Sequence, residues 1–249
     1  MLAIIGGSGL SKLASLEPTG RRVVRTPYGE PSTALTMGRV RGRDLMFIAR
    51  HGYGHTIAPH KINYRANIWA LKDQGATEVI SVASVGGIRR GFGPGALVVP
   101  DQIIDYTCGR SSTFFEGLDG QVTHVDFTEP YSQPLRARIL AAAQACGEVL
   151  ADGGVYAATQ GPRLETAAEI NRLERDGADL VGMTGMPEAA LAREAGLAYA
   201  AINVVANHAA GRGDSEHAIV LEAIEAVLED AMGRVRRIIE ALASPSFRS

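Results

Sequence analysis

Seven short apolar runs rich in valine and isoleucine recur along the chain, and segments with a helical repeat lie between most of them. Apolar β-branched runs favour strands, whereas apolar residues at steps of three and four favour helices. Strands that alternate with helices are typical of layered α/β folds, so the sequence predicts an α/β domain. The expected strands are residues 2–5, 45–49, 78–82, 96–100, 154–158, 179–183 and 198–205.

Five segments are predicted to be helical, and the last has the clearest repeat. Its apolar residues follow steps of three and four from Leu221 to Leu242, which indicates one buried face. Ser215 is the expected N-cap of this helix, and Ser244 before Pro245 marks its expected end. The expected helices are residues 61–74, 134–146, 165–176, 187–195 and 216–243.

Composition argues against several classes of protein. The 249 residues carry a formal net charge of −2, so the basic surface that nucleic-acid-binding proteins need is not expected. Cys108 and Cys146 form no CxxC motif, which argues against a disulfide framework or a zinc knuckle and favours a reducing cytoplasm. No apolar run approaches the roughly 20 residues of a membrane span, and the N-terminus does not resemble a signal peptide. We expect one cytoplasmic domain over residues 1–243 and a loose tail over residues 244–249.

The stretch IARHGYGHTIAPHKIN, residues 48–63, holds three of the six histidines directly after Arg50. Two glycines lie between His51 and His55, a proline follows, and no carboxylate lies among the histidines, so a loop is expected and a metal site is disfavoured. An ordinary loop role suits His55 and His60. Arg50 and His51 follow an expected strand, where α/β folds bind ligands. The planar fork of Arg50 would match a phosphate bidentately, and His51 would add a further donor.

Small-residue turns are expected after two of the strands. AIIGGSGL places Ser8 in such a turn, and SVASVGG places Ser84 just before two glycines. The first turn is not a complete dinucleotide-binding fingerprint, and one glycine-rich turn alone is uninformative. Backbone N–H groups in these turns can closely approach an oxyanion. Together with Arg50 and His51 at a third strand end, they predict one phosphate-sized pocket.

Six longer motifs, in order, resemble the trimeric purine nucleoside phosphorylases, in the branch of methylthioadenosine and methylthioinosine phosphorylases. The motifs are GGSGL, ARHGYGHTIAPHKINYRANIWALK, THVDFTEPY, GPRLETAAEI, DLVGMTGMPEAALAREAGL and NVVANHAAG, and the resemblance runs from about residue 2 to about residue 240. It implies a single domain whose central mixed, twisted sheet is flanked by helices. It also implies phosphorolysis, in which orthophosphate attacks the anomeric carbon of a purine nucleoside and the base leaves, with no metal and no organic cofactor.

The resemblance assigns a phosphate site and a sugar site to particular positions. Met183 by itself would be interpreted as a core residue, but the resemblance puts it beneath the sugar as an apolar wall. His55 and His60 are implied to lie behind the phosphate ligands or simply in the loop. Ser8, His51 and Asn207 are implied to take part in catalysis. The implied phosphate site consists of Ser8, Arg50, His51, Ala83, Ser84 and Thr184.

Two residues are implied to read the purine base. Members of the family specific for 6-oxopurines carry an amide at the position of Asn207, which can donate to O6 and N7, and a carboxylate at the position of Glu165, which accepts from N1–H. Adenine-specific members resemble this chain but carry aspartate and serine there. Without the resemblance, Asn207 would be a loop residue and Glu165 a helix N-terminal acid favoured by the macrodipole. Leu164, His208 and Ala209 are assigned to the same substrate site.

The 5′ end of the nucleoside is implied to meet the start of the last helix. Inosine and guanosine phosphorylases hold the 5′-hydroxyl with a polar residue there, usually histidine. Leu221 aligns with that position and Val220 lies beside it, which favours a methylthio group. A small alignment gap would instead bring His217 into place. The expected activity is phosphorolysis of 5′-methylthioinosine, with a general 6-oxopurine phosphorylase, a methylthioadenosine phosphorylase and a catalytically inactive purine-binding protein as alternatives.

The motif THVDFTEPY bears on assembly. By itself His124 would be an ordinary loop residue. The resemblance implies that this loop crosses a trimer interface, so that His124 and nearby Phe127 complete the 5′ pocket of an adjacent chain. We therefore expect a homotrimer that binds a purine nucleoside and phosphate, and neither nucleic acid nor a membrane.

Overall fold

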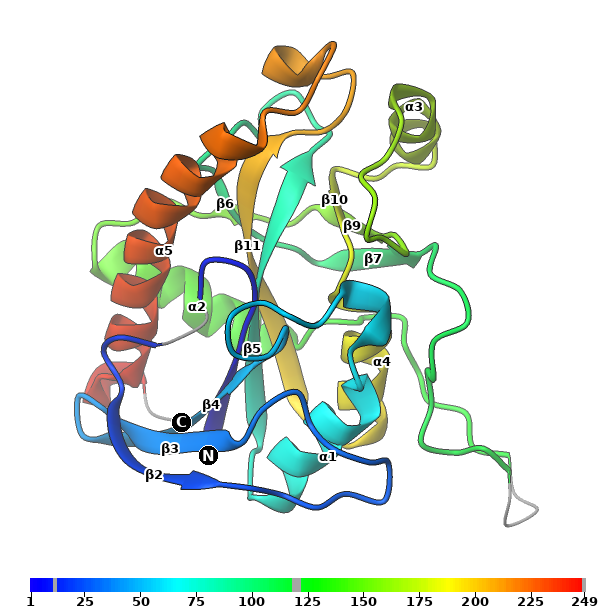
Figure 1. Cartoon of the computed structure of the whole chain (residues 1–249). Helices are drawn as coiled ribbons and strands as arrows, with labels where there is room; N and C mark the ends of the chain where they lie inside the picture. The colour runs from blue at the N-terminus through cyan, green and yellow to red at the C-terminus, as the bar shows by residue number, and fades with distance from the viewer. Residues whose placement is uncertain (11–12, 118–121, 248–249) are drawn as a thin grey trace.

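The computed structural model describes residues 1–10, 13–117 and 122–247 (Figure 1). Within these residues, eleven strands form one mixed sheet with α-helices around it. The strands are β1 (Leu2–Gly6), β2 (Glu17–Arg22), β3 (Leu35–Val40), β4 (Arg43–Ala49), β5 (Glu78–Gly87), β6 (Leu97–Val99), β7 (Gln102–Asp105), β8 (Ala151–Asp152), β9 (Val155–Ala158), β10 (Leu180–Gly182) and β11 (Ala198–His208). The helices are α1 (Tyr64–Asp73), α2 (Gln133–Ala145), α3 (Ala167–Arg175), α4 (Gly185–Glu194) and α5 (Leu221–Ala243), with 3-10 turns η1 (Pro59–Lys61), η2 (Gly213–Ser215) and η3 (Pro245–Phe247).

Four parallel neighbours, β4, β1, β5 and β11, form the centre of the sheet. Strand β5 also pairs antiparallel with β10, and β10 continues in parallel to β9 and β7. The predicted α/β class and single mixed sheet are therefore confirmed, and each of the seven expected strands is present. Strand β5 is longer than predicted, because pairing with β11 extends it to Gly87. Ser84 therefore lies within a strand, and the expected turn at this position was wrong.

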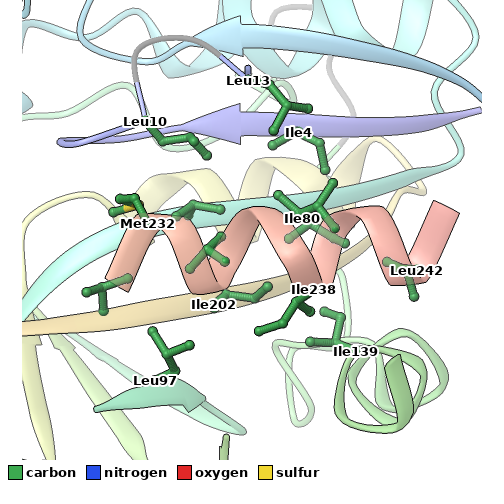
Figure 2. Close-up of a cluster of buried hydrophobic side chains, with 14 of the residues drawn as sticks. Ile4, Leu10, Leu13, Ile80, Leu97, Ile139, Ile202, Met232, Ile238 and Leu242 are labelled. Atoms are coloured by element: carbon green, nitrogen blue, oxygen red, sulfur yellow. The ribbon is translucent and has the colours of Figure 1, made fainter. Parts of the chain in front are cut away.

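Helices cover both faces of the central strands. Leu2 and Ile4 of β1 face α5 and α2, whereas Ala3 and Ile5 face α1 and α4, because successive side chains of a strand point to opposite faces. Figure 2 shows the α5 side, where Ile238 packs over the sheet. Burial on both faces explains why these parallel strands are continuous apolar runs in the sequence rather than alternating ones.

The last helix begins later than predicted. Helix α5 starts at Leu221, and Val220 is its N-cap, in an extended conformation. Ser215 instead ends the turn η2 and is buried, so the expected Ser215 cap was wrong. The predicted end is confirmed, since Ser244 is the C-cap. The buried face of α5 starts at Leu228, and the first turn is left free to contribute to a cavity.

The C-terminal segment continues past α5 in the turn η3. Phe247 is partly buried against the core on the α5 side, and residues 248 and 249 of the predicted tail lie outside the described residues. None of the helices in the described part of the chain combines the length and the apolar character that a membrane crossing requires.

Candidate active site

A cavity of about 540 Å³ lies where the central strands end. The cavity is lined by residues that closely follow β1, β4 and β10 and by the last residues of β5 and β11. Ligands of α/β sheets bind at such strand ends. Its volume is within the range of small-molecule sites. The predicted site residues that line it are Ser8, Arg50, His51, Ala83, Ser84, Leu164, Glu165, Met183, Thr184, Asn207, Ala209 and Leu221. The structure thus brings these predicted site residues together around one cavity, and the role of each residue in binding or catalysis stays a prediction.

The turn after β1 brings Ser8 to the cavity. Leu10 N–H donates to the Gly7 carbonyl over 3.0 Å and closes the turn. A Cβ atom on Gly7 would lie 2.6 Å from the Val82 oxygen and 2.8 Å from Nη1 of Arg50. Glycine is therefore required at position 7 by close approach, and it allows the Ser8 turn to pack directly against the Arg50 guanidinium.

Arg50 is completely buried and its fork is already occupied. Nε and Nη2 donate to the two oxygens of Glu188 at 2.6 and 2.9 Å, and Nη1 donates to the Val82 carbonyl at 3.1 Å. Burial opposes the charge, but the carboxylate outweighs it and raises the pKa of Arg50. The expected bidentate grip on phosphate is therefore wrong in its geometry, because the edge that would make it faces a protein carboxylate. Only the Nη1 edge remains for a ligand.

His51 is buried and its tautomer is fixed. Nδ1 lies 2.9 Å from the Ile57 carbonyl, which can only accept, so Nδ1 carries a proton. Burial, and then the charge of Arg50, lower the pKa of His51 to about 4. Near neutral pH the ring is therefore uncharged and Nε2 is an acceptor. The expectation that His51 adds a donor to the site is corrected accordingly. The His55 ring lies against it at a tilt of 33°, with centroids 4.4 Å apart.

The strand end at Met183 and Thr184 is held by two side chains that sequence reasoning missed. The Tyr156 hydroxyl accepts from the backbone N–H of Thr184 at 3.2 Å. Nη1 of Arg110 donates to the backbone oxygens of Met183 and Met186 at 2.8 and 2.6 Å. A Cβ on Gly161 would collide with the Met183 side chain, so this loop closes tightly on the cavity wall.

Glu165 is free to face the cavity because other residues cap helix α3. Thr166 is the N-cap, and its side chain and that of Glu169 form a reciprocal capping box. The alternative that Glu165 serves as a helix N-terminal acid is thus not needed. Its carboxylate accepts instead from the Thr159 hydroxyl at 2.7 Å, which leaves its second oxygen available.

A β-bulge re-aims the end of β11. The register with β5 shifts between Val205 and Asn207, and Asn207 then lines the cavity. Its Nδ2 donates to the His208 carbonyl at 2.6 Å, so Oδ1 and one further N–H remain for a ligand. The His208 side chain lies outside the cavity lining, with Nδ1 3.7 Å from the Asp214 carboxylate, so this structure does not support its assignment to the substrate site. The reason is the bulge, since it turns Asn207 toward the cavity and leaves His208 outside the lining.

The cavity has an aliphatic end formed by Leu221 and Ile224 of the first turn of α5 and by Ile219, which precedes the helix. Leu221 is 62% exposed although it lines the cavity. The neighbouring Val220 is 57% exposed and is not among the residues that line the cavity. The expectation that Val220 lies beside Leu221 in the site was therefore wrong. His217 is also exposed and outside that lining.

The loop that carries His124 contributes to the surface of this chain. His124 is exposed, and Phe127 is partly buried against the α4 side of its own core. Phe127 is therefore committed, at least in part, to packing within one chain, and His124 lies outside the lining of this chain's cavity. Among the described residues, no group of three or more His, Cys, Asp or Glu side chains is arranged to hold a metal ion.

Comparisons with known proteins agree with this architecture. A family model described as the phosphorylase superfamily matches residues 1–244. A probable S-methyl-5'-thioinosine phosphorylase of Xanthomonas campestris is 55% identical over 91% of this chain and 90% of that protein. A 6-oxopurine nucleoside phosphorylase of Pyrococcus furiosus is 44% identical over 92% of this chain and 88% of that one. The solved structure of a methylthioadenosine phosphorylase from Schistosoma mansoni with adenine has a TM-score of 0.91 and 32% identity, and the match covers 97% of this chain and 90% of that one.

Proposed function

This chain belongs to the phosphorylase superfamily, and from that premise we propose that it is a purine nucleoside phosphorylase acting on S-methyl-5'-thioinosine. An oxygen of orthophosphate bonds to C1′ of the sugar as the bond from C1′ to N9 of the purine breaks. The base takes up a proton and leaves as hypoxanthine, and the sugar leaves as S-methyl-5-thioribose 1-phosphate. Such a reaction depends mainly on positioning and on stabilising charge that develops in the transition state.

The phosphate end of the cavity is assigned to Ser8, Arg50, His51 and Thr184. The Nη1 edge of Arg50 packs against the Ser8 turn, so both can donate to one phosphate oxygen or to neighbouring ones. Neutral His51 presents an acceptor, which suits the single hydroxyl of hydrogenphosphate. Ala83 and Ser84 contribute the adjacent strand end. We propose that no metal ion or organic cofactor takes part.

The base end supports a 6-oxopurine. With Thr159 on one oxygen, the other oxygen of Glu165 can accept from the N1–H that hypoxanthine carries and adenine lacks. Asn207 keeps one N–H for O6 and keeps Oδ1 for the proton that N7 gains as the base leaves. Adenine would instead set the N1 lone pair against a carboxylate, which is unfavourable.

The observation that carries the choice of nucleoside is the aliphatic lining next to these polar groups. Ile219, Leu221 and Ile224 offer no hydrogen bond to a 5′-hydroxyl, and leaving a hydroxyl buried and unpaired is costly. A methylthio group gains from the same contacts. A general 6-oxopurine phosphorylase is the second candidate, because the base end fits it equally well.

The direct test measures free purine released from methylthioinosine, methylthioadenosine and inosine, with and without phosphate and with a chelator present. We expect phosphate-dependent release that is fastest from methylthioinosine and indifferent to the chelator. Equal release from inosine would favour the general enzyme, and faster release from methylthioadenosine would contradict the assignment of Asn207 and Glu165. Binding without release from any of them would identify a purine-binding protein.

We also propose that the enzyme is a cytoplasmic homotrimer with three sites, each bordered by His124 of an adjacent chain. The exposure of His124 and of the cavity residue Leu221 supports this, because a neighbouring chain could cover both. A site shared in this way would exclude water without a longer loop.

A further inference from the structure

A closed hydrogen-bonded network lies behind the phosphate end of the cavity, and Glu188 of α4 is its centre. Its carboxylate is 1% exposed and accepts from Arg50 on both oxygens. Oε1 also accepts from the Ser81 hydroxyl at 2.7 Å and from the Tyr199 hydroxyl at 2.8 Å. Strands β5 and β11 and helix α4 thus all meet at one buried carboxylate.

The network leaves Arg50 little freedom. Nη2 donates to Glu188 and also to Ser81 Oγ at 2.5 Å, and Nη1 donates to the Val82 carbonyl. A guanidinium has five N–H groups, and these bonds use four of them. Within the described residues, one N–H on Nη1 is left, on the edge that packs against Gly7. The guanidinium can therefore meet a ligand only at this edge and in one orientation.

The charges in this network also balance. Arg50 and Glu188 are both withdrawn from solvent and their formal charges cancel. His51 is the other titratable side chain assigned to phosphate. Its Nδ1 donates to the Ile57 carbonyl, so Nε2 of the uncharged ring is an acceptor and adds no positive charge. A phosphate at this site would therefore be held by directed hydrogen bonds more than by net positive charge, and such binding depends steeply on the orientation of the donors.

We propose that Glu188 is the positioning residue of the phosphate site and acts through Arg50, with Tyr199 and Ser81 fixing its carboxylate. The inference rests on the proposed phosphate site. Shifting the carboxylate rotates the Arg50 guanidinium, and so the Nη1 edge no longer meets phosphate correctly. Within the described structure, the side chains assigned to the base, Glu165 and Asn207, hydrogen-bond to Thr159 and the His208 carbonyl and make no hydrogen bond to this network.

Two variants test the proposal at different strengths. Glu188→Asp keeps the charge but retracts the carboxylate from Arg50, and it should raise the KM for phosphate by about tenfold or more. Tyr199→Phe removes one hydrogen-bond donor to Oε1 of Glu188 and should raise the KM for phosphate by a smaller factor. Tyr131→Phe is the matched control, because this buried ring stacks 6.0 Å from Tyr199 while its hydroxyl makes no hydrogen bond to Glu188 in the described structure.

The expected result is a raised KM for phosphate, an unchanged KM for methylthioinosine, and wild-type values for Tyr131→Phe. A purely structural role would lower Tm while leaving the two KM values unchanged or changed alike, and either outcome overturns the proposal. The rise in Tm caused by inorganic phosphate gives a second readout without turnover. If the wild-type chain releases no purine but is stabilised by phosphate, the proposed reaction fails while loss of that stabilisation in Glu188→Asp still supports the positioning role. If phosphate neither stabilises the wild-type chain nor accelerates purine release, both proposals fail.

Discussion

Arg50 is a structural residue as well as a candidate ligand for phosphate. Arg50→Ala leaves Glu188 charged and unpaired in the core, so we expect the free energy of unfolding to fall by about 3–5 kcal/mol. The double variant Arg50→Met/Glu188→Leu removes both charges and should recover most of that stability. It should not recover phosphate-dependent purine release. Urea unfolding and the release assay measure the two effects, and a double variant that used phosphate normally would contradict the assignment of Arg50.

His51 predicts a dependence of stability on pH. Because its pKa falls to about 4 in the folded state, from about 6.5 when unfolded, the unfolded chain binds the extra proton between these values. Its contribution is therefore fully present above pH 6.5 and is lost as the pH falls toward 4, with an upper limit of about 3 kcal/mol. The difference in free energy of unfolding between the wild type and His51→Gln should therefore become smaller as the pH is lowered from 6.5 to 4. A difference that stayed constant would show that His51 titrates normally.

Asn207 and Glu165, the two residues assigned to recognise the base, predict a change in base specificity when they are replaced. Asn207→Asp with Glu165→Ser should shift the ratio of rates from methylthioinosine toward methylthioadenosine, since both carriers of the 6-oxopurine preference are removed. Asn207→Asp alone should mainly damage methylthioinosine turnover, because a carboxylate facing O6 is repulsive. Thr159→Val should lower methylthioinosine turnover severalfold by releasing Glu165. An unchanged ratio in the double variant would disprove this scheme.

Secondary structure was predictable where the signal is local and apolar. Strand β1 is buried on both faces and its residues read as one apolar run. Strand β2, with the sequence EPTGRR, is exposed throughout and exists because it pairs with β3. No pattern in the residues of β2 indicates that pairing. Strand β8 was not predicted either, because its two residues are too few to show a pattern. The start of α5 was placed too early because Ser215 matches the N-cap preference, whereas tertiary contacts bury it in η2.

The site was predictable to a similar extent. Parallel strand ends converge, so Ser8 and Arg50 could be placed together from their positions after expected strands, whereas Asn207 was placed by the family resemblance. The direction in which each side chain points could not. Glu188 lies 138 positions from Arg50, inside a helix that reads as ordinary buried structure, and it decides which edge of the guanidinium is available. The bulge at the end of β11 likewise decides that Asn207 faces the cavity and His208 does not.

The first turn of α5 should control the preference at the 5′ end. Leu221→His places a polar side chain where the aliphatic lining now lies, and should favour inosine over methylthioinosine by about tenfold relative to wild type. Val220→His is the matched control, because this neighbour is similarly exposed but lies outside the described lining. The comparison is the ratio of kcat/KM for the two nucleosides. The same shift in both variants would mean that α5 does not line the 5′ site.

The apolar rim of the cavity bears on how the chains assemble. Leu164 and Leu221 border the cavity and are 43% and 62% exposed, so part of the apolar rim is open to solvent. Coverage by a neighbouring chain in a cyclic trimer would bury this rim, with the loop of one subunit meeting a different patch on the next. Solution mass should therefore be that of a trimer, and His124→Ala should raise the KM for methylthioinosine more than that for phosphate. A fully active monomer would rule out the shared site.

Mixing two defective chains tests sharing directly. Asn207→Ala chains lack a base-reading residue and should be inactive, whereas His124→Ala chains should show a raised KM for methylthioinosine. In a mixed trimer, a site built on a His124→Ala chain can receive the intact His124 of an adjacent Asn207→Ala chain. Denaturing and refolding the two together should therefore produce a class of sites with the wild-type KM. If each site is complete within one chain, the mixture shows only the raised KM at reduced total activity, since no subunit then contains both intact residues.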